Sequence, residues 1–314
     1  MSNFTASRFG ANNGASDKVE LFLKVFGGEA LAALYTKNKT MDKHLVRSIA
    51  SGKSAQFPVS GKGTASYHVP GTELTGSAIL HSERVISIDD KLIADRFIAD
   101  IDEAMVHYEI RSIYTQDVGE ALARKWDQNV LNTVVLAARS AATVTGESGG
   151  TVITAATAGT DATALRNAIY DAVEAMAIKN VDCSDETWVY VRPSQYYLLI
   201  DDPKLFNRDY TSGANGGIDS GVVLRVAGVP LVMTNNLPGT DLSADASFQT
   251  KYRGNFATTV AAVARKQAVG TVKLMEMSLE VERSVRHQGT LIVGGLAVGS
   301  GILRPEFAAE IKTA

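Results

Sequence analysis

The chain has 314 residues, of which 45% are hydrophobic and 21% charged, and its formal net charge is −3. This composition excludes a disordered chain, and the near balance of charge argues against a dedicated nucleic-acid-binding protein. The single cysteine, Cys183, excludes an internal disulfide framework and any multi-cysteine metal cluster, and we expect a small, partly buried thiol there. Residues 1–20 lack an apolar signal segment and no stretch is apolar enough to span a membrane, so we expect folding in a cytoplasm and no membrane partner.

The N-terminal part of the chain reads as an arm with a basic end. Residues 1–16 are polar, and an amphipathic segment from Asp17 to Leu34 is interrupted by two adjacent glycines. Residues 1–62 carry nine basic and four acidic side chains, whereas residues 100–143 carry four basic and seven acidic ones. We therefore expect the basic arm to lie on an acidic surface of a neighbouring copy, with two ordinary solvated surfaces as the alternative.

The segment from Ser51 to Ser82 is rich in glycine and proline and has too few large apolar residues to form its own core. Its return limb, residues 84–89, alternates apolar and polar side chains and predicts a strand. Loops this long in compact domains are usually functional or disordered. Because a long helix follows, we expect this segment to be an arm that packs on another copy of the chain.

A helical pattern runs from Asp100 to about Thr143. Asp100 and Glu103 fit a capping box at its start, and apolar side chains, Trp126 among them, recur at helical spacing. Arg139 lies near the end, where the helix dipole favours a positive charge. About 40 residues would span roughly 60 Å, so we expect a spine rather than a core helix.

The rest of the chain contains shorter elements. In chain order the pattern predicts a Thr- and Gly-rich linker over 143–160, a helix over 162–179, a strand over 187–191, a short helix from Pro193, a turn at Asn215-Gly216-Gly217, strands around 222–234 and several long strands over 257–303. Glycines within the last strands indicate bulges or close backbone contacts. Helices and strands are segregated rather than alternating, so the expected fold class is α+β.

No local pattern predicts a catalytic, cofactor-binding or metal site. Ser51-Gly52-Lys53-Ser54 copies the end of a phosphate-binding loop, but Arg47 stands where that motif needs a glycine. The five histidines show no metal-binding spacing, and no nucleophile elbow is present. Neighbouring carboxylates, which hydrolases also use, are interpreted as helix ends and solvated faces; they occur at Asp89-Asp90, Asp100/Asp102/Glu103, Asp201-Asp202 and Glu280/Glu282.

Longer segments carry a family resemblance. They are LFLKVFGGEALAAL (Leu21–Leu34), HLVRSIASGKSAQFPVSG (His44–Gly61), ERVISIDDKLIADRFIADIDEAMVHYEIRSIYTQDVGEALA (Glu83–Ala123), VAGVPLVMTNNLP (Val226–Pro238), AVGTVKLMEMSLEVERS (Ala268–Ser284) and LRPEFAA (Leu303–Ala309). With them the chain resembles the major capsid protein of short-tailed, podovirus-type bacteriophages of the autographivirus group, which has the Hong Kong 97 capsid fold. The match is weakest over 145–162 and 239–256.

The resemblance implies a part for each region. These parts are an N-terminal arm over 1–50, an extended E-loop over 51–90, a peripheral P-domain over 91–162 with a spine helix at about 100–143, an axial A-domain over 163–267, and P-domain strands with the C-terminus over 268–314.

The resemblance further implies a structural protein without catalytic activity or cofactors. Many copies would form pentamers and hexamers of an icosahedral shell around double-stranded DNA, in a virion assembled in the bacterial cytoplasm. A scaffolding protein, a portal protein and weakly contacted DNA are the implied partners.

The residues that we expect at contacts between subunits are Arg47, Lys53, Phe57, Lys62, Tyr67, Val69 and Ile79. Lys53 and Lys62 are expected to be solvated or paired with a neighbour, without covalent cross-links. Two alternatives stay open: the shell protein of an encapsulin-type bacterial nanocompartment, and a soluble α+β hydrolase that uses the scattered carboxylates.

Overall fold

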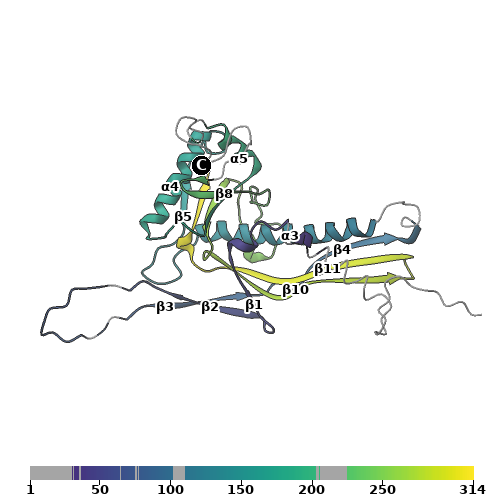
Figure 1. Cartoon of the computed structure of the whole chain (residues 1–314), viewed down its shortest axis with the longest axis horizontal. Coiled ribbons are helices and arrows are strands. Elements are labelled where there is room, and N and C mark those ends of the chain that lie inside the picture. Colours follow the sequence, from purple (N-terminus) through teal and green to yellow (C-terminus); the bar gives the residue numbers. More distant parts are fainter. Residues whose placement is uncertain are drawn as a thin grey trace, which may run out of the picture. The chain divides into compact units, whose positions relative to one another are not determined.

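A computed structural model describes residues 30, 32–34, 37–63, 65–74, 76, 78–101, 110–202, 205 and 225–314. Its contacts separate into two units. Unit 1 comprises 1–38, 89–126 and 274–298, and unit 2 comprises 39–88, 127–273 and 299–314. Figure 1 labels the elements. Within the described residues, no helix combines the length and hydropathy needed to cross a membrane.

In unit 1 strands pack against a helix. Strand β4 (Leu92–Ala99) runs antiparallel to β11 (Gly289–Ile302), with Phe97 opposite Leu291. The sheet has the order β1-β10-β11-β4. In it β10 (Val269–Ser284) begins in unit 2, where it pairs with β1 (Leu45–Ser48) of the same unit. A Cβ at Gly294 would lie 2.5 Å from Cγ1 of Val118, so this glycine lets the helix approach the strand, as predicted for the glycines of this run.

Helix α3 (Ile110–Ala138) is the predicted spine, with a different end. Asp100 and Ile101 are helical, while 102–109, which include Glu103 of the predicted capping box, lie outside the described residues. The prediction that the helix continues to Thr143 is wrong. The last turn tightens, since the Ser140 amide donates to the Ala137 carbonyl at 3.0 Å. The Ser140 hydroxyl also donates to the Leu136 carbonyl at 2.7 Å, which competes with further helical bonding.

Arg139 has a stronger partner than the helix dipole. Its Nε and Nη2 donate to the carboxylate of Glu310 at 2.6 and 2.5 Å, and Glu310 is fully buried. The hydrogen bonds that the guanidinium donates to this carboxylate raise the pKa of Arg139. The residue that the sequence placed near the helix end therefore connects that end to the last strand of the chain.

Unit 2 contains a six-stranded sheet of order β5-β12-β9-β6-β8-β7. Its strands are β5 (Thr151–Thr154), β6 (Thr187–Val191), β7 (Arg225–Val226), β8 (Val229–Met233), β9 (Thr259–Arg265) and β12 (Ala308–Lys312). Parallel pairs (β5 with β12, β6 with β8) stand beside antiparallel ones (β12 with β9, β6 with β9). This mixed sheet with separate helices confirms the α+β class.

The helices of unit 2 agree with the sequence pattern, but the linker before them does not. Helix α4 (Ala162–Ile178) begins where the Asp161 carboxylate accepts the Thr163 amide at 2.9 Å, an N-cap. Helix α5 (Pro193–Ile200) starts at the predicted proline. The 143–160 linker, expected to be irregular, contains β5, because its β-branched residues suit a strand beside β12. The predicted turn at 215–217 lies outside the described residues.

The described residues also form three short 3₁₀ helices: η1 (Met41–Lys43), η3 (Thr250–Tyr252) and η4 (Pro305–Phe307). The remaining two strands, β2 (Ser54–Ser60) and β3 (His81–Ser87), form a separate antiparallel hairpin, with Ser54 opposite Ser87 and Ser60 opposite His81. The hairpin base belongs to the core of unit 2. Ala55 and Ile86 are buried against Val272 and Leu303, and Phe57 packs on the same cluster.

Candidate functional site

The connection between β2 and β3 presents apolar side chains to solvent. Every described residue between 62 and 80 is exposed. Its large apolar residues, which we call the tip residues, are exposed over much of their surface: Tyr67 (104%), Val69 (65%), Leu74 (80%), Ile79 (44%) and Leu80 (57%). Figure 1 draws the connection as a long open loop at the end of the hairpin. Exposed apolar residues gathered on one segment mark an interaction site more often than isolated ones do.

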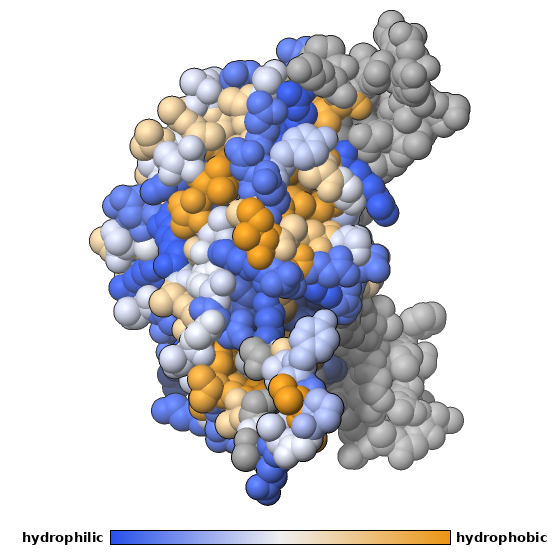
Figure 2. All heavy atoms as spheres, turned by 90° about the vertical axis from the view of Figure 1, so that its left-hand side faces the viewer, coloured by the Kyte–Doolittle hydropathy of each residue, from blue (hydrophilic) through white to orange (hydrophobic). Residues whose placement is uncertain are grey.

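Figure 2 views the molecule from the side to which this loop extends. Orange apolar residues lie there among blue hydrophilic ones. The tip residues, which are exposed on a loop beyond the hairpin, suit contact with another macromolecule rather than with a small ligand.

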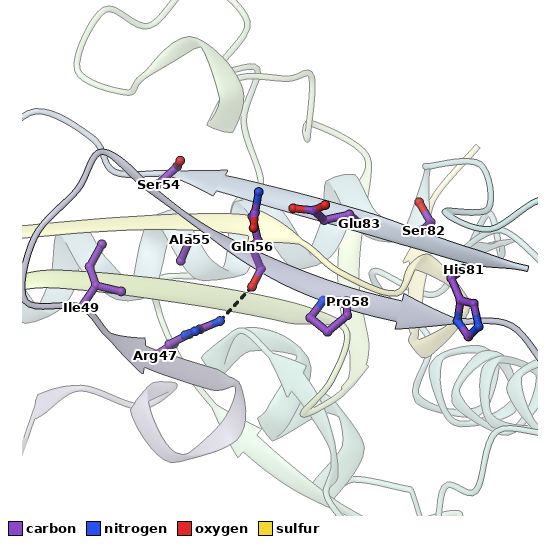
Figure 3. Close-up of a pocket in the computed structure, with 9 residues that line it drawn as sticks. All are labelled: Arg47, Ile49, Ser54, Ala55, Gln56, Pro58, His81, Ser82 and Glu83. Carbon is purple, nitrogen blue, oxygen red and sulfur yellow. Dashed lines mark hydrogen bonds between the residues drawn. The ribbon is translucent and has the colours of Figure 1, made fainter.

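An open groove of about 810 Å³ runs along the hairpin base (Figure 3). Its lining residues come from β1, β2, β3 and the segment after β1: Arg47, Ile49, Ser54, Ala55, Gln56, Pro58, His81, Ser82 and Glu83. Nη1 of Arg47 donates to the Gln56 carbonyl at 2.8 Å, the dashed contact in Figure 3. The guanidinium also lies 5.9 Å from the Phe57 ring centroid, a cation–π distance. Among the described residues, no group of three or more His, Cys, Asp or Glu could hold a metal ion.

The residues predicted at subunit contacts fall into two groups. Tyr67, Val69 and Ile79 are exposed tip residues, and Lys53 is exposed at the start of the hairpin. Arg47 and Phe57 instead contact each other and their own subunit. The structure thus brings Arg47 and Phe57 together at the base and leaves the described side chains of the tip exposed to solvent. Contact of any of them with a neighbour stays a prediction.

Lys62, expected to be solvated or paired with a neighbour, is exposed but also has partners in its own subunit. Its backbone amide donates to Oε1 of Glu147 at 2.7 Å, and its Nζ donates to the Lys179 carbonyl at 2.7 Å. Nζ also lies 3.8 Å from Oε2 of Glu147. These partners follow Lys62 by 85 and 117 residues. No local sequence signal could have found them, because they come from the turn before β5 and the end of α4.

The basic segment before the hairpin is also engaged within its own chain. Nζ of Lys37 lies 3.0 Å from Glu120 of α3 in unit 1. In unit 2, the buried carboxylate of Asp127 accepts the backbone amides of Lys39 (2.8 Å) and Thr40 (3.2 Å). Burial raises the pKa of Asp127, and these hydrogen bonds oppose the rise. At these positions, acidic residues of the spine helix bind the basic segment of their own chain.

Comparison with known proteins gives one consistent family. The model of the Gp10A-like major capsid proteins matches residues 56–312. The chain is 37% identical to the major capsid protein of Enterobacteria phage T3, covering 96% of this chain and 94% of that protein. It is 34% identical to the major capsid protein of Escherichia phage T7, covering 99% of both.

A solved structure extends the likeness to three dimensions. The capsid of the cyanophage P-SCSP1u contains a chain that is 43% identical and superimposes with a TM-score of 0.77, covering 100% of this chain and 99% of that one. The Hong Kong 97-like fold expected from the resemblance is therefore confirmed, and the chain belongs to the Gp10A-like family of major capsid proteins.

Proposed function

We propose that many copies of this chain assemble, through pentamers and hexamers, into the icosahedral shell that encloses the double-stranded DNA of a short-tailed phage, and that assembly takes place in the bacterial cytoplasm. The observation that carries the proposal is the exposed tip: Tyr67 and Leu74 are 104% and 80% exposed in the single chain. Apolar side chains on a segment that leaves its own core gain free energy only when another surface covers them.

The proposed geometry is a closed ring. A segment of one copy that packs on a different surface of the next copy makes a head-to-tail contact, and such contacts close when the rotation per copy divides a full turn. In this arrangement Lys53 and the tip residues face a neighbour, whereas Arg47 and Phe57 support the hairpin base from within.

The regions of the chain take the parts that the family resemblance implies. In this proposal they are the N-terminal arm (1–50), the E-loop (51–90), the P-domain (91–162 and 268–314) and the A-domain (163–267). The two contact units support a division at 88/89 and near 273/274. They divide the spine helix at 126/127, whereas this proposal keeps the whole helix in the P-domain.

Further partners in this proposal are a scaffolding protein and a portal protein during assembly, and packaged DNA. A net charge of −3 suits a container for DNA, because each phosphate contact by a basic residue adds salt-dependent affinity that a container does not need.

The role proposed is structural, without catalysis or cofactors. Three of the carboxylates that could have served a hydrolase form ion pairs within the chain. Asp202 is buried with Arg166 at 2.6 Å, Asp100 accepts from Arg283 at 2.8 Å, and Glu280 lies 3.8 Å from Lys91 on an exposed strand. Each of these ion pairs links two segments of the chain, as structural ion pairs do.

Negative-stain electron microscopy of the protein, purified alone and after co-expression with the phage scaffolding protein, tests the proposal. We expect closed particles of uniform diameter in the co-expressed sample. Only monomers or small discrete oligomers under all conditions would contradict it. Particles that enclose a host enzyme instead of accepting DNA would favour the nanocompartment alternative.

A further inference from the structure

We infer that a collar of contacts around residues 60–62 fixes the direction in which the E-loop leaves its subunit, and that Glu147 and Lys62 are the positioning residues of this collar. The inference rests on the proposed function, because the direction of the loop matters only if its tip contacts another copy. It adds a role for residues outside the contact itself.

Three successive residues, the last of β2 and the two that follow it, each make a hydrogen bond within their own subunit. The Ser60 carbonyl accepts Nη2 of Arg304 at 2.9 Å. The Gly61 amide donates across the hairpin to the Leu80 carbonyl at 2.9 Å. Lys62 then donates twice, through its amide to Glu147 and through Nζ to the Lys179 carbonyl. Beyond this point every described residue up to 80 is exposed. The collar is therefore where the loop leaves the subunit.

Close packing at Gly61 is a second, independent sign of a fixed position. A Cβ on this residue would lie 3.1 Å from the Leu80 carbonyl oxygen, 3.3 Å from Oε1 of Glu147 and 3.4 Å from Cγ1 of Val144. Val144 is buried. Only a residue without a side chain lets the hairpin lie this close to the turn before β5. An alanine would force the Leu80 carbonyl, the Glu147 carboxylate or Val144 to move by a few tenths of an ångström.

The partners of the collar are themselves held in place. Nζ of Lys179 donates to the carbonyls of Gly149 (2.8 Å) and Gly150 (3.0 Å). This ties the end of α4 to the turn that carries Glu147. Glu147 is 18% exposed and Lys62 is 48% exposed at the side chain. The ion pair is therefore weak by itself, and the two 2.7 Å hydrogen bonds hold the position.

The geometric consequence concerns the whole shell. Tyr67, Val69, Leu74 and Ile79 follow the collar along the chain and are exposed, so a small rotation at 60–62 becomes a larger displacement at 67–79. Ring closure depends on the angle between neighbouring copies. A loosened collar should therefore yield particles of mixed size or open sheets from subunits that are still folded.

The test compares Glu147→Ala, Glu147→Gln and Gly61→Ala with the wild type. Glu174→Ala, an exposed glutamate of α4, is the matched control. Hydrogen exchange in the unassembled chain should be about tenfold faster at the Lys62 amide in Glu147→Ala, since one charge-assisted hydrogen bond is lost. Glu147→Gln keeps an acceptor oxygen and should exchange nearly as slowly as the wild type. Gly61→Ala keeps every hydrogen-bonding group and changes only the position.

Particle diameters after co-expression with scaffold provide the second measurement. Glu147→Ala and Gly61→Ala should broaden the distribution or prevent closure while the melting temperature of the unassembled chain stays unchanged, and Glu174→Ala should assemble normally. Uniform shells from both collar variants, or unchanged exchange in Glu147→Ala, would overturn the inference. Absence of shells from the wild type would instead refute the proposed function, so the two failures are distinguishable.

Discussion

Trp126 is among the largest fully buried side chains of the described structure, at 1% exposure on α3. Trp126→Ala should lower the free energy of unfolding of the unassembled subunit by about 3–5 kcal/mol, because the substitution leaves a cavity in a packed interior. Chemical denaturation measures it. Ile113→Ala, on the exposed side of the same helix (62%), is the control and should change stability by less than about 0.5 kcal/mol. Equal effects of the two substitutions would show that Trp126 is not a core residue.

His44 makes the subunit sensitive to acid. It is 4% exposed, and its Nδ1 lies 2.6 Å from the Thr40 carbonyl, which can only accept, so Nδ1 carries the proton. Burial lowers the pKa of His44 to about 4. As the pH falls, the imidazole takes up a second proton in the unfolded chain, where its pKa is near 6.5, before it does so in the folded chain. The stability is therefore complete above pH 6.5 and falls, by up to roughly 3 kcal/mol, as the pH drops from 6.5 to 4.

His44→Gln removes this titration. The difference in unfolding free energy between wild type and variant, measured on the unassembled chain from pH 7.5 to 4, should shrink steadily below pH 6.5. A difference that is independent of pH would show that His44 titrates normally. The other groups of the chain contribute equally to both proteins and cancel.

At the residue scale the sequence located side chains on elements but not their distant partners. The helical spacing placed Trp126 on the inner face of the spine, and the structure confirms its burial. The sequence assigned Arg139 to the helix dipole and predicted that Lys62 is solvated or paired with a neighbour, whereas Glu310 and Glu147 of the same chain contact them. Those partners are 171 and 85 residues away, and a single sequence contains no record of such pairs.

The β2–β3 hairpin is the element on which assembly should depend. Replacing 65–79 by a Gly-Ser linker of equal length keeps the collar at 60–62 and removes every tip residue except Leu80. We expect an unchanged melting temperature for the unassembled chain, because none of the described residues replaced is buried, and no closed particles. Calorimetry and electron microscopy measure the two outcomes. Loss of the thermal transition would mean that the loop stabilises its own subunit.

At the element scale, periodicity succeeded where the pattern was long and failed at boundaries. Helix α4, strand β6 and helix α5 lie within a residue or two of their predicted ranges. The spine ends at Ala138 rather than near Thr143, because the Ser140 side chain and the tightened last turn stop it. The sequence did not predict strand β5, because a four-residue strand between glycines and threonines shows too little periodicity. The strand forms because it pairs with β12.

The whole shell should be held together without covalent cross-links. Lys62 is engaged by the Lys179 carbonyl and Glu147, and Lys53 is exposed. Neither lies in the apolar pocket that a nucleophilic lysine needs. Boiling purified particles in detergent should release a single band near 33.4 kDa on a denaturing gel. A ladder of pentamers, hexamers and larger species would refute this prediction.

At the scale of the whole molecule, the composition of residues 51–82, which have too few large apolar residues to form a core, predicted an arm. The family resemblance indicated that this arm contacts another copy. The hairpin base shows the limit of that reasoning. Ala55, Phe57 and Ile86 pack on Val272 and Leu303 of the same chain, so only the distal part is free. Composition alone could not divide the segment, since the base is buried by strands from the far end of the sequence.

The proposed assembly depends on contact between the E-loop tip of one copy and the surface of the next. Cryo-electron microscopy of closed particles at side-chain resolution tests it most directly. We expect Tyr67 and Val69, which are 104% and 65% exposed in the single chain, to be buried against a neighbouring subunit. Residues 60–62 should keep their contacts to Glu147, Lys179 and Arg304. Tips that remain in solvent, or that fold back on their own subunit in closed particles, would contradict it.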